Sequence, residues 1–193
     1  MELSLFEKII KHYTLAFLIF LFASLLLVSP ETPILQTVLA VLLVHGWVYF
    51  VHRASHLIPN AFFNTHMKYH HQFPPKTIPR HLELFYETFF DSGMNLLLFG
   101  VQKALGVNWI PVPVILLFTV TYMSIHIINY SIFGSTFHRR HHDTLDKNFA
   151  PDAMDHIMGT NYNEEFEDLN PCSLNAFGAC FLLYPLKEYI IKL

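Results

Sequence analysis

The sequence predicts an all-α integral membrane protein with about four transmembrane helices and a histidine-rich cap on the cytoplasmic side. The chain has 193 residues, of which 53% are hydrophobic and only 14% charged, whereas soluble domains carry about 25% charged residues. Four apolar segments have roughly the length that crosses a bilayer. The 13 histidines concentrate beside the ends of these segments. We therefore treat residues 1–193 as a single membrane domain.

The first span is expected at about residues 13–29. Two lysines, Lys8 and Lys11, precede the apolar run Leu15–Val28, and this arrangement also occurs in signal peptides. The run is long for a signal peptide, and Leu-Val-Ser-Pro at residues 27–30 is a poor cleavage site. We expect a retained helix that ends in the turn Pro30–Pro33.

The other three spans are expected at residues 34–51, 82–105 and 109–132. The second ends directly at His52, and the third is polar in its first half, with a clean apolar part from Met94 to Val101. Polar residues follow the even-numbered spans. The cytoplasmic cap is therefore expected from residues 52–80 and 137–193.

The distribution of basic residues predicts the orientation. Lys8 and Lys11 place the N-terminus in the cytoplasm by the positive-inside rule. Two crossings return the chain to that side at His52, and two more return it there at His138. The basic residues that follow these crossings include Arg53, Arg139 and Arg140. The even number of crossings and the positions of the basic residues thus both place all the histidine clusters on one face of the membrane.

The histidine spacing predicts a metal site. Residues three or four apart share a helix face, so His52 can pair with His56, His66 with His70, and His138 with His141 or His142. Adjacent histidines point about 100° apart on a helix, so a doublet can serve two metals. His126 lies within the last span. Nine imidazoles are too many for one ion but suit a di-metal site.

The donor set favours iron over structural zinc, which commonly uses cysteine. Two irons with open positions can reduce O2 and break an unactivated C–H bond, for which side chains alone lack the oxidising power. Cys172 and Cys180 form no C-x-x-C motif and are expected to be free thiols. The formal net charge of −3 and the lack of basic runs argue against nucleic acid.

Carboxylates near the histidines are candidates for orienting them, because metal-bound imidazoles usually donate their second N–H to such a group. Turn and helix-cap chemistry is the alternative role for the aspartates. At membrane depth, Glu87 and Asp91 would be costly unless functional. The candidates are Asp143, Asp146, Asp152 and Asp155 after the last cluster, and Glu83, Glu87 and Asp91 at four-residue intervals in the third span.

At these motifs the chain resembles the fatty acid hydroxylase superfamily, which includes sterol desaturases and C4-methyl sterol oxidases. The resemblance covers roughly residues 40–162. The matching stretches are YFVHRASH at 49–56, HMKYHH at 66–71, HRRHH at 138–142, DKNFA at 146–150 and MDHIMGT at 154–160.

The resemblance implies a membrane oxidoreductase with two non-haem Fe ions, which hydroxylates or desaturates a sterol or fatty acyl chain with O2. It also implies an external electron donor (cytochrome b5, ferredoxin or a reductase) and an active site on the cytoplasmic side of the endoplasmic reticulum or bacterial inner membrane. No catalytic residue beyond the metal ligands is implied. Those ligands would be His52, His56, His66, His70, His71, His126, His138, His141 and His142.

The chain departs from the family pattern at four positions. His45 stands where the family often has aspartate, and Tyr130 stands where some members have a further histidine. Ala150 replaces a glycine. His156 is a candidate tenth ligand, although we expect it to be a bystander.

Three other functions compete with the lipid oxidase. A carotenoid hydroxylase also carries histidine clusters. A non-catalytic membrane haem protein would need histidines deep within two spans, and only His45 and His126 qualify. A metal transporter or scaffold would need polar residues through every span, yet residues 15–23 are apolar. A zinc protease is disfavoured because no His-Glu-x-x-His occurs.

Overall fold

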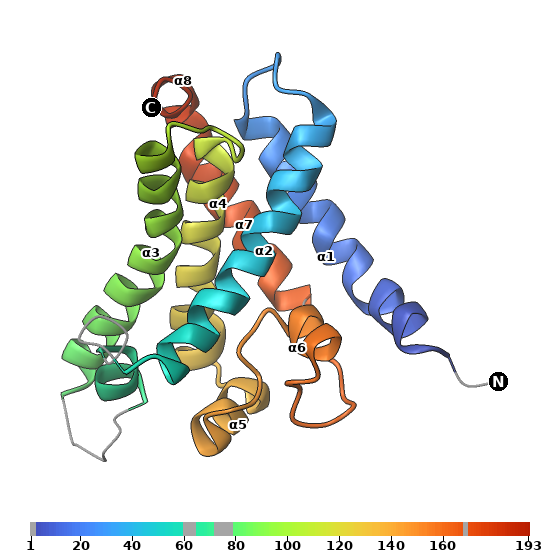
Figure 1. The fold of residues 1–193 in the computed structure, drawn as a ribbon, viewed down its shortest axis with the longest axis vertical. Helices are drawn as coiled ribbons and strands as arrows, with labels where there is room; N and C mark the ends of the chain where they lie inside the picture. The colour runs from blue at the N-terminus through green and yellow to red at the C-terminus, as the bar shows by residue number, and fades with distance from the viewer. Residues whose placement is uncertain (1–2, 60–64, 72–78, 168–169) are drawn as a thin grey trace.

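The computed structural model describes residues 3–59, 65–71, 79–167 and 170–193, and these ranges contain helices and no strand. The all-helical prediction is therefore confirmed. Figure 1 shows the arrangement of the elements. In chain order they are α1 (Leu5–Leu27), α2 (Ile34–Leu57), the π-helix η1 (His66–His70), α3 (Arg80–Leu105), α4 (Val112–Ser124), the π-helix η2 (Ile125–Ile132), α5 (Thr136–Thr144), α6 (Asp152–Met158), α7 (Asn170–Leu183), the 3-10 turn η3 (Tyr184–Leu186) and α8 (Lys187–Ile190).

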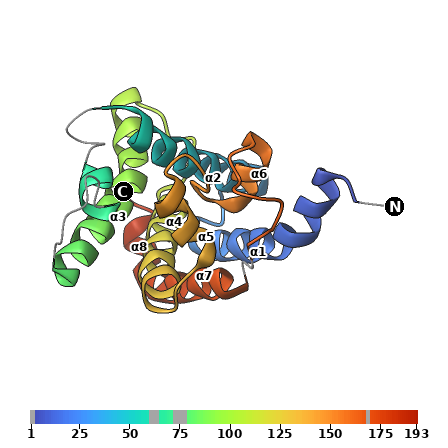
Figure 2. The ribbon, with the colours of Figure 1, turned by 90° about the horizontal axis from the view of Figure 1, so that it is seen from below.

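Helix α4 forms the centre of the bundle and contacts α1, α2, α3 and α7. Seen along the bundle, these four helices lie around it (Figure 2). The core contains fully buried side chains of α4, such as Leu117, and of α2, such as Val41. Helix α4 is hydrophobic on every side, which is the pattern of a helix surrounded by others.

Within the part of the chain that the structure describes, three helices are long and apolar enough to cross a membrane: α1, α2, and the continuous helix formed by α4 with η2. The expected third span is also one helix, since α3 covers 26 residues. Its first half is polar, and Glu87 is buried there. This half of α3 therefore turns Glu87 and Phe90 to the interior of the protein, whereas Leu82, Phe85 and Phe89 are exposed on its outer face.

Helix α1 begins earlier than the expected first span. Ser4 and Glu7 form a capping box, in which the Ser4 side chain accepts from the Glu7 backbone and the Glu7 side chain accepts from Ser4. This exchange satisfies backbone donors at the helix start. The helix is extended by these polar residues and by Lys8 and Lys11, which project it beyond the apolar run.

The C-terminal residues differ from the expected cap. Helices α5 and α6 lie at the histidine end, but α7 runs back along the bundle and α8 lies at the opposite end (Figure 1). The reason is an apolar stripe on α7, in which Ala176, Ala179, Cys180 and Leu183 are buried in the main core. Their spacing of three and four residues matches one helix face. At the far end, the Lys187 Nζ donates to the Leu26 carbonyl at 2.8 Å.

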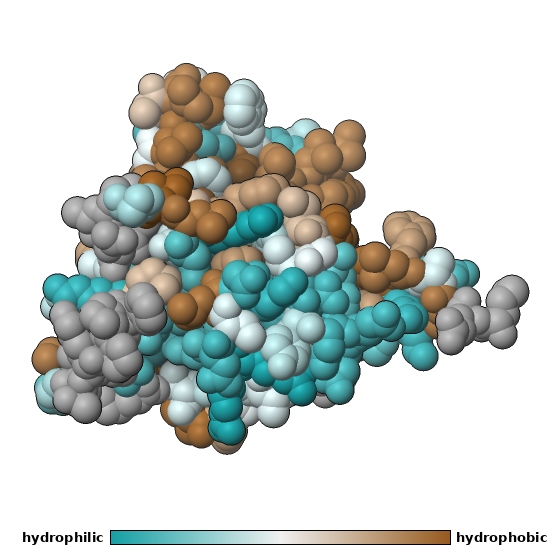
Figure 3. All heavy atoms as spheres, turned by 60° about the horizontal axis from the view of Figure 1, so that its bottom comes forward, coloured by the Kyte–Doolittle hydropathy of each residue, from teal (hydrophilic) through white to brown (hydrophobic). Residues whose placement is uncertain are grey.

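The surface fits this arrangement. Hydrophilic residues gather on the end that carries α5 and α6, whereas hydrophobic residues dominate toward the opposite end (Figure 3). On α1, Leu15, Leu18 and Phe22 are 59%, 52% and 55% exposed. A contiguous apolar exterior of this kind is stable only when lipid or another protein covers it.

Candidate metal centre

The π-helical turn η1 decides how the second histidine cluster is used. The His71 backbone N–H donates to the His66 carbonyl at 3.2 Å, which is a five-residue step. A π turn therefore brings His66 and His71 to the same side. The pairing of His66 with His70, expected from α-helical spacing, is wrong for this reason.

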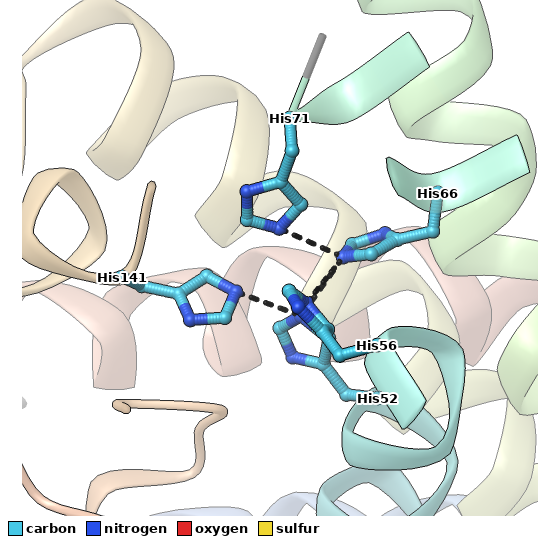
Figure 4. Close-up of side chains that lie close together, drawn as sticks. All are labelled: His52, His56, His66, His71 and His141. Carbon is cyan, nitrogen blue, oxygen red and sulfur yellow. Dashed lines mark hydrogen bonds between the residues drawn. The ribbon is translucent and has the colours of Figure 1, made fainter. Parts of the chain in front are cut away.

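Five histidines converge in a first group at the end of α2, as the close-up shows (Figure 4). One ring nitrogen of each lies within 4.8 Å of the others. The Nε2 of His66 is 3.0 Å from that of His52, 3.2 Å from that of His56 and 3.1 Å from that of His71. The Nε2 of His141 is 3.2 Å from that of His52.

Three histidines form a second, adjoining group: His70, His138 and His142. The Nε2 of His142 is 3.1 Å from that of His70 and 3.0 Å from that of His138. The sequence neighbours His70 and His71 thus belong to different groups, and so do His141 and His142. This is the division that a 100° offset between adjacent residues favours.

His126, the remaining candidate ligand, lies beside the second group but outside it. Its ring centroid is 5.2 Å from that of His138 and 5.9 Å from that of His70. Its Nδ1 donates to the Tyr122 carbonyl at 3.2 Å. The side chain is 1% exposed, and it comes from the π-helix η2. Such turns are frequently found at functional sites.

The nitrogen–nitrogen distances fit a metal shell. Two imidazoles bound at about 2.0–2.1 Å from one ion, with an angle of about 90–109° between them, place their nitrogens about 2.8–3.4 Å apart. All the Nε2–Nε2 distances above, in both groups, fall in this interval. Facing imidazole nitrogens with no shared ion would repel through their lone pairs unless one is protonated. The donor geometry of both groups therefore suits bound metal.

The loop after α5 orients two of the histidines in the first group. The Nδ1 of His141 donates to the Lys147 carbonyl at 2.5 Å, and the Nδ1 of His52 donates to the Phe149 carbonyl. A proton fixed on Nδ1 leaves Nε2 as the free ligand atom. The backbone of this loop thus sets the tautomer of both imidazoles.

Asp155 holds the loop in place. Its carboxylate accepts from the Phe149 N–H at 2.9 Å, the Ala150 N–H at 2.7 Å and the Thr160 hydroxyl at 2.7 Å. Ala150 has a φ of +59°, a conformation that favours glycine. The Asp155 contacts keep this strained backbone in place.

Burial keeps the imidazoles neutral. The pKa values of His66, His70, His138 and His141 lie well below the ordinary histidine value, first because burial penalises the charged form and second because neighbouring imidazoles repel a second charge. Metal ligands must be deprotonated. Both groups are therefore in the state that binds metal at neutral pH.

The carboxylates expected to orient the histidines differ in their positions relative to the two groups. Glu87 is 2% exposed, and its Oε1 lies 3.8 Å from the Nδ1 of His70, which places it behind the second group. Asp143, in the last turn of α5, and Asp146, in the loop that follows, are exposed on the surface. The side chain of Asp91, another candidate, lies outside the described residues.

The other two singled-out histidines lie away from both groups. His45 packs edge-on against Phe20 and Phe118, and its Nδ1 donates to the Val41 carbonyl at 2.7 Å. His156 stacks on Phe166 with ring centroids 4.0 Å apart. The expectation that His156 is a bystander agrees with this position.

Sequence reasoning did not find a buried acidic cluster behind the histidines. The Glu167 N–H donates to the Asp152 Oδ2 at 2.9 Å, and the Tyr13 hydroxyl donates to the same oxygen. The Ser135 hydroxyl donates to Glu167 at 3.2 Å. Burial, together with the charge of Asp152, raises the pKa of Glu167 to about 7. No local motif reveals this cluster, because its members are far apart in the sequence.

Comparison with known protein families identifies a match. The family model described as fatty acid hydroxylase matches residues 37–160, which is more than half of the chain and includes every histidine of both groups. No curated protein and no solved structure matches the chain.

Proposed function

Because the chain belongs to the fatty acid hydroxylase family, we propose that it is an O2-dependent, non-haem di-iron oxidase that hydroxylates or desaturates a lipid. In hydroxylation, one C–H bond breaks and one C–O bond forms. One oxygen atom of O2 enters the product and the other leaves as water, using two electrons and two protons from an external donor. The observation that carries the proposal is the pair of adjoining all-imidazole groups at one end of a membrane bundle.

The proposed ligands of one iron are the five histidines of the first group. The proposed ligands of the other are His70, His138 and His142, with His126 as the fourth. Imidazole suits iron, and the groups described here contain no thiolate and no carboxylate. When bound, two irons would supply the oxidising power that side chains lack.

The residues around the groups position the ligands and exclude water. The carbonyls of Lys147 and Phe149 hold the Nδ1 protons of His141 and His52. Glu87 faces the Nδ1 of His70 and favours an N–H there. His66, His126 and His141 are at most 2% exposed. A dry site strengthens the electrostatic interactions within it and limits side reactions.

The external partners follow from the location of the site. We propose that the histidine end faces the cytoplasm, in the endoplasmic reticulum or the bacterial inner membrane, because Arg53, Arg139 and Arg140 lie near it in the sequence. A separate electron donor (cytochrome b5, a ferredoxin or a reductase) would dock on this end. The polar cap is proposed to comprise residues 52–80 together with α5 and α6.

The test compares two histidine variants. His141→Ala should abolish lipid-dependent O2 consumption and lower the iron content, while the circular dichroism spectrum stays helical. His81→Ala, which removes an exposed histidine on α3 outside both groups, should behave like the wild type. Full turnover by His141→Ala would contradict the ligand assignment.

A further inference from the structure

A cavity of about 370 Å³ lies between α1, the α4–η2 helix, α6 and α7. Its size is within the range of small-molecule sites. Most of its wall is apolar, with Phe17, Phe20 and Phe118 among the lining residues. On α1 the wall runs from Ile9 to Phe20, a distance of about 16 Å at 1.5 Å per residue. An extended hydrocarbon chain fits a cavity of this shape.

One end of the cavity is polar and acidic. Asp152 and Glu167 line it together with Tyr13 and Tyr130. Among the described residues, the contacts of the Asp152 carboxylate are made by Oδ2: with Tyr13, with the Glu167 N–H and with His156. None of these contacts uses its Oδ1, and the residue lines the cavity. Asp152 is only 4% exposed, so a hydrogen bond from a ligand to this carboxylate would be shielded from water.

The lack of cationic side chains among the described residues of the wall argues against an anionic ligand. No lysine or arginine is among the described residues that line the cavity. A buried carboxylate ligand would need such a partner, because burying an unpaired charge is costly. Placed beside Asp152 and Glu167, it would also meet like charge. A hydroxyl, an amine or an amide N–H would instead find acceptors.

The acidic end adjoins the histidines. A second, narrow cavity is lined by His52, His126 and His138. Both cavities share Tyr122, Tyr130, Ala150, Asp152 and Glu167 in their walls. A lipid whose polar group lies at the acidic end would therefore place the carbons next to that group closest to the proposed irons.

On the basis of the proposed oxidase function, we propose that this cavity is the substrate site and that the substrate is a lipid with a hydrogen-bond-donating polar group, rather than a free fatty acid. Its hydroxyl, amine or amide N–H bonds to Asp152 and Glu167, and its tail extends along α1 toward Phe20. The carbon that is oxidised lies within a few bonds of the polar group.

The test is a binding measurement on the iron-loaded protein in nanodiscs. Radiolabelled octadecanol is displaced by unlabelled octadecanol, octadecylamine or stearate, which share one chain length and differ in the polar group. The alcohol and the amine should bind at least about tenfold more tightly than stearate, which corresponds to about 1.4 kcal/mol. Equal or tighter binding of stearate would overturn the proposal.

Two variants locate the site. Ala16→Trp fills the cavity from α1 and should reduce octadecanol affinity at least about tenfold. Leu18→Trp places the same side chain on the exposed face of α1, outside the wall, and should not. Glu167→Gln should reduce the preference for octadecanol over stearate, because a carboxylate that repels stearate is removed. Unchanged affinity in Ala16→Trp, or an unchanged preference in Glu167→Gln, would contradict the assignment.

This measurement is independent of turnover. Selective octadecanol binding by a protein that oxidises no lipid would support the cavity and contradict the oxidase. Lipid turnover by a protein that shows neither the selectivity nor the Ala16→Trp effect would support the oxidase and overturn the cavity assignment.

Discussion

Asp155→Asn tests whether the loop after α5 orients the histidines. The wild-type carboxylate accepts three hydrogen bonds, two from the backbone N–H groups of Phe149 and Ala150 and one from Thr160. An asparagine keeps one acceptor oxygen and turns the other into an NH2 group. That group would face the Ala150 N–H, so two donors would oppose each other at a position that is 1% exposed.

The expected loss of stability follows from these contacts. Leaving one buried donor unsatisfied costs about 1–3 kcal/mol. The backbone carbonyls that hold His52 and His141 belong to the same loop, so their orientation should loosen as well. Loss of an orienting contact behind a metal ligand typically lowers metal affinity about 10–100-fold. We therefore expect both effects in one variant.

The assay combines thermal unfolding in detergent with competitive metal titration. Asp146→Asn is the matched control, because Asp146 is exposed on the same loop. It should leave both quantities unchanged. Wild-type unfolding temperature and wild-type metal affinity in Asp155→Asn would refute the orienting role.

Three further predictions use the same measurements. Cys172→Ser and Cys180→Ser should keep wild-type metal content, since neither thiol belongs to a histidine group, and loss of metal in either variant would contradict an all-imidazole site. The pKa of Glu167 is raised to about 7 in the folded state, so the folded protein keeps a proton there that the unfolded chain loses above pH 4.5. The free energy of unfolding should therefore fall by up to about 3 kcal/mol as pH rises from 4.5 through 7. Glu167→Gln should flatten that fall, and an identical pH profile would exclude the residue as its source. Gly134→Ala, at φ +79° in the link to α5, should destabilise by about 1–2 kcal/mol, whereas Gly178→Ala in α7 should stabilise by up to about 1 kcal/mol; equal effects on thermal unfolding would contradict the strained-turn argument.

The helices of the bundle could be predicted well because apolar length is a local property. Helix α4 with η2 begins and ends close to the expected residues, and α2 begins at the expected residue 34 but continues to Leu57, beyond the expected end at residue 51. The sequence does not predict that α7 belongs to the bundle, although its buried residues repeat at helical spacing. The helix is short, and the polar residues on both sides of it favour a cap. Its place depends on contacts with α1 and α4, which no local pattern gives.

The histidines of the site could be found from sequence, but their division could not. Spacing predicts that His52 pairs with His56, and both belong to the first group. It fails for His66 because η1 is a π turn, and a π turn has no clear sequence signature. The cluster of Asp152, Glu167 and Tyr13 depends on tertiary contacts between α1, α6 and the segment before α7. Such contacts are set by the fold rather than by neighbouring residues.

The most direct test of the two-metal centre is iron content per chain in protein reconstituted with Fe(II), measured together with the absorption spectrum. The wild type should hold about two irons without a haem Soret band, since each of the two groups takes one ion. His142→Ala, which alters only the second group, should hold about one. A Soret band, a single iron in the wild type, or two irons in His142→Ala would contradict the account.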